Sequence, residues 1–63
     1  MAIKEKRIAA GMSQEQLAEA SGVTRASISR YENGERRPNV WTAIKIARAL
    51  RCTVEDLLTE RTV

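Results

Sequence analysis

Two arginines, Arg25 and Arg30, lie close together in a segment of helix-forming residues, with the small residues Ala26 and Ser29 between them. A guanidinium group can donate two hydrogen bonds to O6 and N7 of guanine, and alanine or serine can contact a thymine methyl group or other base edges. Small side chains beside the arginines would allow a close approach. Arg25, Ala26, Ser29 and Arg30, here called the base-reading set, are therefore predicted to contact bases in the major groove of DNA.

The same four residues could instead form an ordinary solvated face. At about 100° per residue, Thr24, Ile28 and Tyr31 share the other side of the segment and are predicted to face the core. A surface that serves only stability usually mixes charges at i, i+4 spacing. The base-reading set contains no carboxylate, which favours a negatively charged ligand.

Polar and basic residues flank this segment on both sides. Ser13 and Gln14 stand at the start of a predicted helix, where N–H groups favour an anion. Asn33, Arg36 and Arg37 follow the base-reading set. We expect these five residues to contact DNA phosphates, which positions a protein without reading sequence and makes its affinity fall with salt.

Composition argues against several other classes of protein. The 63 residues suffice for one domain, residues 1–63, with a single core. The chain contains no histidine, and its one cysteine, Cys52, cannot form an intrachain disulfide. No metal, cofactor, small-molecule substrate or enzymatic activity is therefore expected. The formal net charge of +3 is compatible with a polyanionic partner.

The N-terminal residues are charged and include no long apolar run. This composition predicts neither a signal peptide nor a membrane span, and hence no membrane partner. We expect a cytoplasmic protein with a reduced Cys52.

Helix formers dominate and no long stretch alternates apolar and polar residues, so the sequence predicts an all-α fold. The predicted helices cover about residues 3–10, 14–21, 24–33, 40–50 and 54–58. Capping-box patterns and single N-cap residues mark their starts, at Ser13 with Gln16, Thr24, Asn39, and Thr53 with Asp56. Glycines mark three of their ends, at Gly11, Gly22 and Gly34.

Apolar residues at helical spacing predict the core. On the first predicted helix, an arginine, Arg7, lies on the same face as Ile3 and Ala10. The other predicted core residues are Leu17, Ala18, Ile28, Tyr31, Val40, Ala43, Ile44, Ala47, Leu50, Val54, Leu57 and Leu58. Residues 59–63 are expected to fray.

Four motifs carry a resemblance that spans nearly the whole chain. They are KRIAAGMSQEQLA at 6–18, GVTRASISRYENG at 22–34, Pro38, and IKIARALRCTVEDLL at 44–58. In these motifs the chain resembles the helix-turn-helix family of phage repressors and Cro proteins, which is often called XRE-like. The resemblance implies a five-helix, lambda-repressor-like domain whose third helix enters the major groove, with dimers on half-sites about one DNA turn apart.

The resemblance also implies roles for individual residues. It assigns base contact to the base-reading set, and phosphate contact to Gln14, Asn33 and the loop after Gly34. It further implies an ion pair between Arg7 and Glu32, which would explain an arginine on the inner face of the first helix. The alternative for Glu32 is an ordinary exposed carboxylate.

Four residues stand out against this pattern. Arg51 occupies a position that is often glycine in the family, Glu35 adds a carboxylate to an expected basic loop, and Lys6 replaces an apolar residue. Trp41 falls on the side of its helix away from the apolar stripe. It is either an incidental exposed aromatic residue or a contact in a homodimer.

These patterns together predict a sequence-specific, double-stranded DNA-binding transcription regulator that acts as a homodimer at least on DNA. A repressor is favoured, because repression requires only occupancy of a promoter. An activator is the first alternative, with Glu15 or Glu19 contacting RNA polymerase. The second is a protein-interaction module, antitoxin-like or adaptor-like, which should carry an apolar patch where Arg25 and Arg30 lie.

Overall fold

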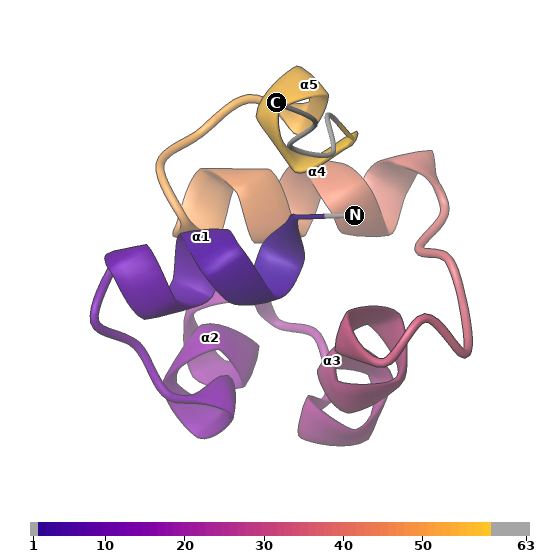
Figure 1. Cartoon of the computed structure of the whole chain (residues 1–63), viewed down its shortest axis with the longest axis horizontal. Coiled ribbons are helices and arrows are strands. Elements are labelled where there is room, and N and C mark those ends of the chain that lie inside the picture. Colours follow the sequence, from indigo (N-terminus) through magenta and orange to yellow (C-terminus); the bar gives the residue numbers. More distant parts are fainter. Residues whose placement is uncertain (1, 59–63) are drawn as a thin grey trace.

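A computed structural model describes residues 2–58, which form five helices and contain no strand (Figure 1). The predicted all-α fold is confirmed, and each predicted boundary lies within one residue of the structure. The helices are α1 (Ile3–Ala9), α2 (Gln14–Ser21), α3 (Arg25–Glu32), α4 (Val40–Ala49) and α5 (Val54–Leu58).

Side-chain caps begin four of these helices, as the sequence predicts. At α2, Ser13 Oγ accepts a hydrogen bond from the Gln16 backbone N–H at 3.0 Å, and Gln16 Oε1 accepts one from Ser13 N–H at 2.8 Å. Thr53 and Asp56 form the same reciprocal box before α5. Thr24 and Asn39 cap α3 and α4 through one bond each. The caps satisfy N–H groups that have no partner within a helix.

Four helices are followed by a residue in the left-handed region, with φ of 71° at Gly11, 75° at Gly22, 76° at Gly34 and 57° at Arg51. After α4, Arg51 N–H donates to Arg48 O at 3.1 Å and Cys52 N–H donates to Ala47 O at 2.9 Å. This pair of bonds is the Schellman motif, in which glycine is the usual residue. Arg51 therefore adopts the glycine conformation at a position where the resemblance leads one to expect glycine.

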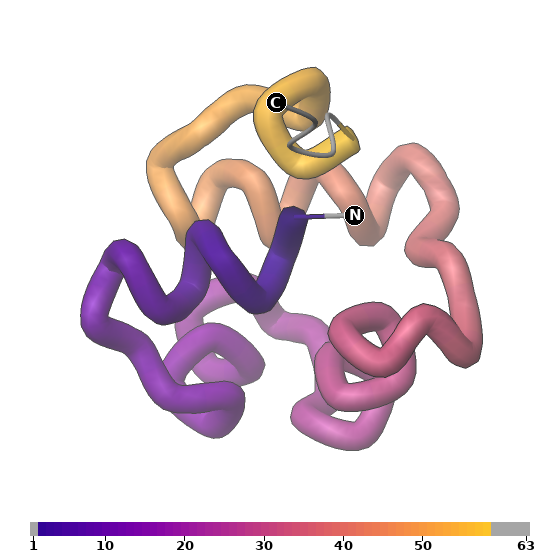
Figure 2. The backbone as a smooth tube through the Cα atoms, viewed as in Figure 1, coloured from indigo at the N-terminus to yellow at the C-terminus, as the bar shows by residue number. Residues whose placement is uncertain are grey.

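The core takes one fully buried side chain from each helix: Ile3, Leu17, Ile28, Ile46 and Leu57. Figure 1 shows α4 passing behind α1, with α2 and α3 on one side of this pair and α5 on the other. The tube in Figure 2 brings the start of α1 next to α5, where Ala2 N–H donates to Leu57 O at 2.8 Å. The first and last helices thus close the domain, and α1 also packs against α3.

Several predicted core positions are wrong. Val40 is 68% exposed because it is the first residue of α4, before the helix reaches the core, and Leu58, the last residue of α5, is 56% exposed. Ala10 is exposed because α1 ends before it. The buried stripe of α4 includes Ile46, which the sequence reading missed and which is fully buried. The predicted fraying of 59–63 lies outside the described residues.

Candidate nucleic-acid interface

The turn between α2 and α3 sets the angle at which α3 is presented. Gly22 ends α2 with φ of 75°, and its N–H donates to Ala18 O. The buried Ser21 hydroxyl donates to Leu17 O at 2.7 Å and accepts from Val23 N–H at 3.2 Å. Ser21 thus ties the last turn of α2 to the turn that follows. The sequence reading gave Ser21 no role, although a serine just before a turn glycine is a typical local hydrogen-bonding residue.

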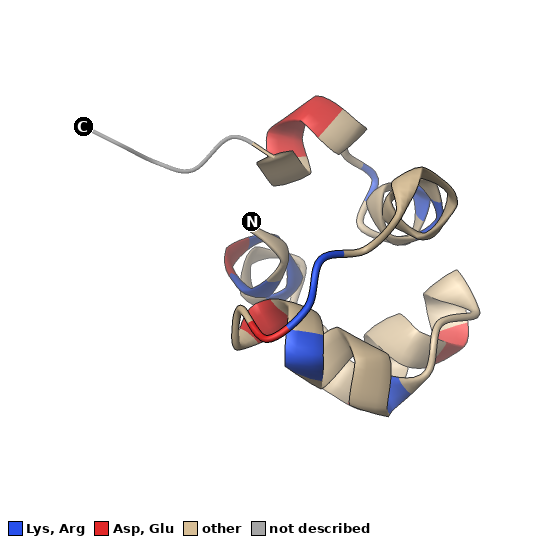
Figure 3. Cartoon of the chain, turned by 90° about the vertical axis from the view of Figure 1, so that its right-hand side faces the viewer, with Lys and Arg blue, Asp and Glu red and all other residues tan. Residues whose placement is uncertain are grey.

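The outer face of α3 holds the base-reading set. Arg25, Ala26 and Arg30 are exposed and Ser29 is half-buried. Within residues 2–58, the side chains of Arg25 and Arg30 form no hydrogen bond or ion pair. Figure 3 shows basic residues near both ends of α3, and acidic residues of α5 at the far side of the domain. The arginines of this face therefore have their donors available for a ligand.

The inner side of α3 differs from the prediction at one residue. Ile28 is fully buried and Tyr31 is half-buried against the core, as predicted. Thr24 is exposed instead, because its hydroxyl caps α3 through the N–H of Ser27 at 3.2 Å. An N-cap residue precedes the first helical turn and so does not share the buried stripe.

The residues expected to contact phosphates lie around α3 in two groups. Ser13 and Gln14 stand at the start of α2, while Asn33, Arg36 and Arg37 lie at and after the end of α3, all exposed except the half-buried Gln14. Figure 3 shows a basic stretch of chain running from α3 towards α4. In the sequence, this stretch comes directly after Glu35. The N–H of Ser13 is already used, because it donates to Gln16 Oε1.

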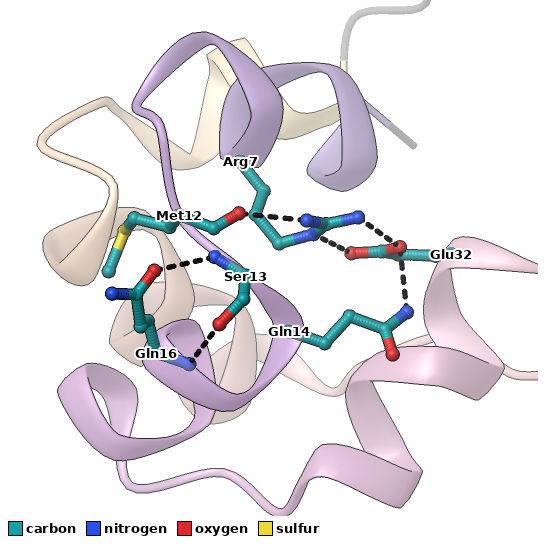
Figure 4. Close-up of polar contacts among 6 residues, drawn as sticks. All are labelled: Arg7, Met12, Ser13, Gln14, Gln16 and Glu32. Carbon is teal, nitrogen blue, oxygen red and sulfur yellow. Dashed lines mark hydrogen bonds and ion pairs between the residues drawn. The ribbon is translucent and has the colours of Figure 1, made fainter.

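An ion pair between Arg7 and Glu32 joins α1 to α3 (Figure 4). Arg7 Nε donates to Glu32 Oε2 at 2.7 Å, and a second guanidinium nitrogen donates to Oε1 at 3.2 Å. The exposed fractions of the two side chains are 13% for Arg7 and 3% for Glu32. Glu32 is therefore not the exposed carboxylate that was the alternative reading.

Two further bonds extend this pair into a network (Figure 4). The remaining guanidinium nitrogen of Arg7 donates to Met12 O at 2.8 Å, which anchors the loop between α1 and α2. Gln14 Nε2 donates to Glu32 Oε1 at 3.0 Å. The sequence reading did not anticipate the bond of Gln14, since that residue was assigned only to a phosphate. The network connects α1, the α1–α2 loop, α2 and α3.

The network shifts the ionisation of both partners. Burial acts to raise the pKa of the Glu32 carboxyl, but hydrogen bonds from Arg7 and Gln14, with the positive charges of Arg7 and Lys4, outweigh it and hold the pKa below its ordinary value. The hydrogen bond to Glu32 raises the pKa of Arg7. Both groups are therefore charged at neutral pH, as a close ion pair requires.

The remaining notable residues lie on α1 and α4. Trp41 is 75% exposed and adjoins the exposed Val40 at the start of α4, while Lys6 is half-buried on α1. No group of three His, Cys, Asp or Glu residues within 2–58 is arranged to hold a metal. Over the same residues, no helix is both long and apolar enough to cross a membrane.

The family comparison covers almost the whole described chain. A helix-turn-helix family model matches residues 3–57. The uncharacterized HTH-type transcriptional regulator YgzD of Bacillus subtilis is 40% identical over 55 residues, which are 87% of this chain and 83% of YgzD. No solved structure matches the chain.

Two relatives carry more specific names. The control protein C.SmaI of Serratia marcescens is 46% identical over 50 residues, which span 79% of this chain and 60% of that protein. The cryptic phage CTXphi transcriptional repressor RstR of Vibrio cholerae is 36% identical over 61 residues, which span 90% of this chain and 54% of RstR. With the family match over all five helices, the chain belongs to the helix-turn-helix family of transcription regulators.

Proposed function

We propose that this chain binds double-stranded DNA in a sequence-specific manner and regulates transcription, with α3 lying in the major groove. The observation that carries the proposal is the outer face of α3, where two exposed arginines have no partner within residues 2–58. The opposite side of α3 is fixed in the core through Ile28. A rigid helix with free donors on its outer face suits the reading of base edges.

The base-reading set divides into two kinds of contact. Arg25 and Arg30 would each donate to a guanine, and a good bidentate pair contributes about 1–3 kcal/mol of discrimination against a wrong base. Ala26 is exposed and small, so it allows α3 to approach a thymine methyl group. Ser29 is half-buried, and only the outward part of its side chain is available for a base.

The phosphate contacts would come from both ends of α3. Ser13 and Gln14 would meet one strand from the start of α2, and Asn33, Arg36 and Arg37 the backbone beyond α3. Positively charged loop residues at such a place fix register and orientation without reading bases. The affinity is therefore expected to fall steeply as salt rises.

Exposed apolar surface on α3 would support the rival function, a protein-interaction module. The large exposed hydrophobic residues of 2–58 lie elsewhere: Ile8, Val40, Trp41 and Leu58. The face that would bind the partner carries arginines instead. This distribution supports DNA over a protein as the ligand of α3.

We also propose a homodimer on DNA, with Trp41 in its interface. Val40 and Trp41 form an exposed apolar pair at the start of α4, directly after the basic loop. Two copies would read two half-sites, which one short domain cannot do alone. Trp41 fluorescence should change with protein concentration or on addition of DNA, and a signal that responds to neither would remove Trp41 from the interface.

Repression is the favoured direction of regulation, because it requires only that a promoter be occupied. The name of RstR as a repressor supports it. Activation is the alternative outcome, since Glu15 and Glu19 are exposed on α2 and available to RNA polymerase. A transcription assay on a promoter that contains the selected site separates the two, by a fall or a rise in transcript.

The remaining expectations form part of the same proposal. Residues 1–63 would act as one cytoplasmic DNA-binding domain, without a cofactor, a small-molecule substrate or enzymatic activity. The helix-turn-helix match over residues 3–57 supports the single domain, and regulators of this family are normally non-enzymatic. The absence of histidine from the sequence supports the last point.

The test is selection of bound duplexes from a random pool, followed by the variants Arg25→Ala and Arg30→Ala. Each variant should lose its preference at one G·C position while binding the other positions with a roughly uniform change. Arg48→Ala, an exposed arginine of α4, is the matched control and should retain the selected preference. Failure to enrich any sequence, or unchanged selectivity in both α3 variants, would contradict the proposal.

A further inference from the structure

We propose that Glu32 is a positioning residue for DNA binding, which holds the Gln14 carboxamide in place for a phosphate. The inference rests on the proposed function and assigns a further role to the ion pair. Gln14 is the first residue of α2, and its side chain is half-buried. Its Nε2 donates to Glu32 Oε1 at 3.0 Å (Figure 4).

The hydrogen-bonding capacity of Gln14 leaves a donor for DNA. A carboxamide has a nitrogen with two N–H donors and one acceptor oxygen. Because an ionised carboxylate only accepts, Glu32 fixes which end of the amide faces it. One N–H is used by Glu32, and within residues 2–58 the second has no partner. The second N–H is thus held at a defined place beside the start of α2.

The support beneath this amide is itself immobilised. Glu32 accepts two bonds from Arg7, and Arg7 donates a third bond to Met12 O. The guanidinium also compensates the negative charge of Glu32, so the carboxylate repels a nearby phosphate less. A long side chain that is fixed before binding loses less freedom when the complex forms. Glu32 would therefore increase DNA affinity without touching DNA.

The place of Gln14 fits an anionic ligand on independent grounds. It stands at the N-terminal end of the eight-residue helix α2, where the helix dipole favours negative charge. The same Glu32 lies at the last residue of α3, which carries the base-reading set. One carboxylate therefore links the phosphate-contacting end of α2 to α3 and sets their relative position.

A double-mutant cycle on DNA affinity tests this role, with a duplex selected by the native protein. The first change is Gln14→Met, which keeps the length of the side chain and removes the amide. The second is the paired replacement Arg7→Met with Glu32→Leu, which removes both charges together so that neither is stranded. Ala20→Met, at an exposed position of α2, controls for adding a methionine. Thermal unfolding identifies any variant that fails to fold.

In the native background, Gln14→Met should weaken DNA binding by about tenfold, the size expected for a hydrogen bond to a charged group. In the paired background the same change should weaken it by less than about threefold, because the amide is no longer held. Ala20→Met should bind as the native protein does. A duplex scanned with single neutral methylphosphonates supplies a second readout, since one position should weaken the native protein and leave the Gln14→Met variant unaffected.

Four outcomes are informative. Equal losses for Gln14→Met in both backgrounds would overturn the role of Glu32, and no loss in the native background would overturn the role of Gln14. If the paired replacement does not fold, the methylphosphonate scan of Gln14→Met still decides whether the amide meets one phosphate. A native protein that selects no duplex at all would instead contradict the proposed function.

Discussion

Arginines in two regions of this domain have opposite environments. Arg7 has an exposed fraction of 13% in its side chain and donates three hydrogen bonds, two to Glu32 and one to Met12 O. Arg25 and Arg30 are exposed on α3 and have no partner within residues 2–58. The same side chain is structural where the fold supplies its acceptors, and is available to a ligand where it does not.

This contrast assigns different consequences to the loss of each arginine or its partner. A guanidinium that is already paired is compensated locally and contributes little to a distant DNA strand. An unpaired guanidinium on a rigid helix keeps its donors for phosphates or bases. Changes in the ion pair should therefore lower stability, beyond their effect on DNA affinity through Gln14, and changes in the base-reading set should lower DNA affinity with little effect on stability. Four predictions test this division, in order of decreasing effect.

Glu32→Ala should produce the largest loss of stability, about 3–5 kcal/mol in the free energy of unfolding, because it leaves the half-buried Arg7 without its carboxylate. Thermal and urea unfolding at neutral pH measure the effect. Glu35→Ala, which removes an exposed carboxylate three residues later, is the matched control and should change stability by less than about 0.5 kcal/mol. An unchanged melting temperature for Glu32→Ala would contradict a structural role for the pair.

The stability of the native protein should fall in acid because of this network. The folded-state pKa of Glu32 lies below the ordinary value of 4.5, so its stabilising effect is complete above that value. The effect is lost as pH falls through the lower, folded-state pKa. Urea unfolding between pH 7 and pH 3 should therefore show a smaller acid loss in the Arg7→Met, Glu32→Leu pair than in the native protein.

The carboxyl of Asp56 also contributes to the loss of stability in acid, so it needs its own control. Hydrogen bonds from the backbone N–H and side chain of Thr53 hold the pKa of Asp56 below its ordinary value of 3.8. Its stabilising effect is likewise lost in acid. Asp56→Asn in both backgrounds removes this contribution. If the native protein and the paired variant then have the same pH dependence, Glu32 is not the source of the difference.

The starts and ends of the helices can be predicted from local signals in the sequence. Serine, threonine and asparagine caps place the starts of four helices, and glycines place the ends of three, since each signal acts within about one helical turn. The ion pair of Arg7 with Glu32 comes from the family resemblance, because the two residues are 25 positions apart and no local pattern joins them. The exposed arginines of α3 follow from helical periodicity.

Other features depend on tertiary packing that periodicity does not determine. The predicted stripe of α4 began at Val40, whereas the buried stripe includes Ile46. Several phases of an apolar helix satisfy the pattern equally well, and neighbouring helices choose among them. The bond from Gln14 to Glu32 depends on the angle between α2 and α3. This hydrogen bond could therefore not be predicted from the sequence.

Arg51 differs from both of these groups of arginines, because its backbone conformation is strained and lowers the stability of the domain. With φ of 57° it ends α4 in a conformation that glycine adopts readily. Arg51→Gly should stabilise the domain by about 0.5–1 kcal/mol, because relief of this strain exceeds the added freedom of the unfolded chain. Arg48→Gly, the same substitution inside α4, should instead destabilise it by about 1 kcal/mol. Urea midpoints that move in the same direction for both would contradict the strain at Arg51.

The smallest effect on stability is expected for the residues with the largest expected effect on DNA binding. Arg25→Ala and Arg30→Ala should each change the free energy of unfolding by less than about 0.5 kcal/mol, since neither side chain has a partner within residues 2–58 to lose. Urea unfolding at low and high salt measures this. A loss above about 1 kcal/mol in either variant would make that arginine structural, and its loss of DNA affinity would then no longer indicate contact. Stability retained together with lost base preference would show that α3 keeps these charges for its ligand rather than for its fold.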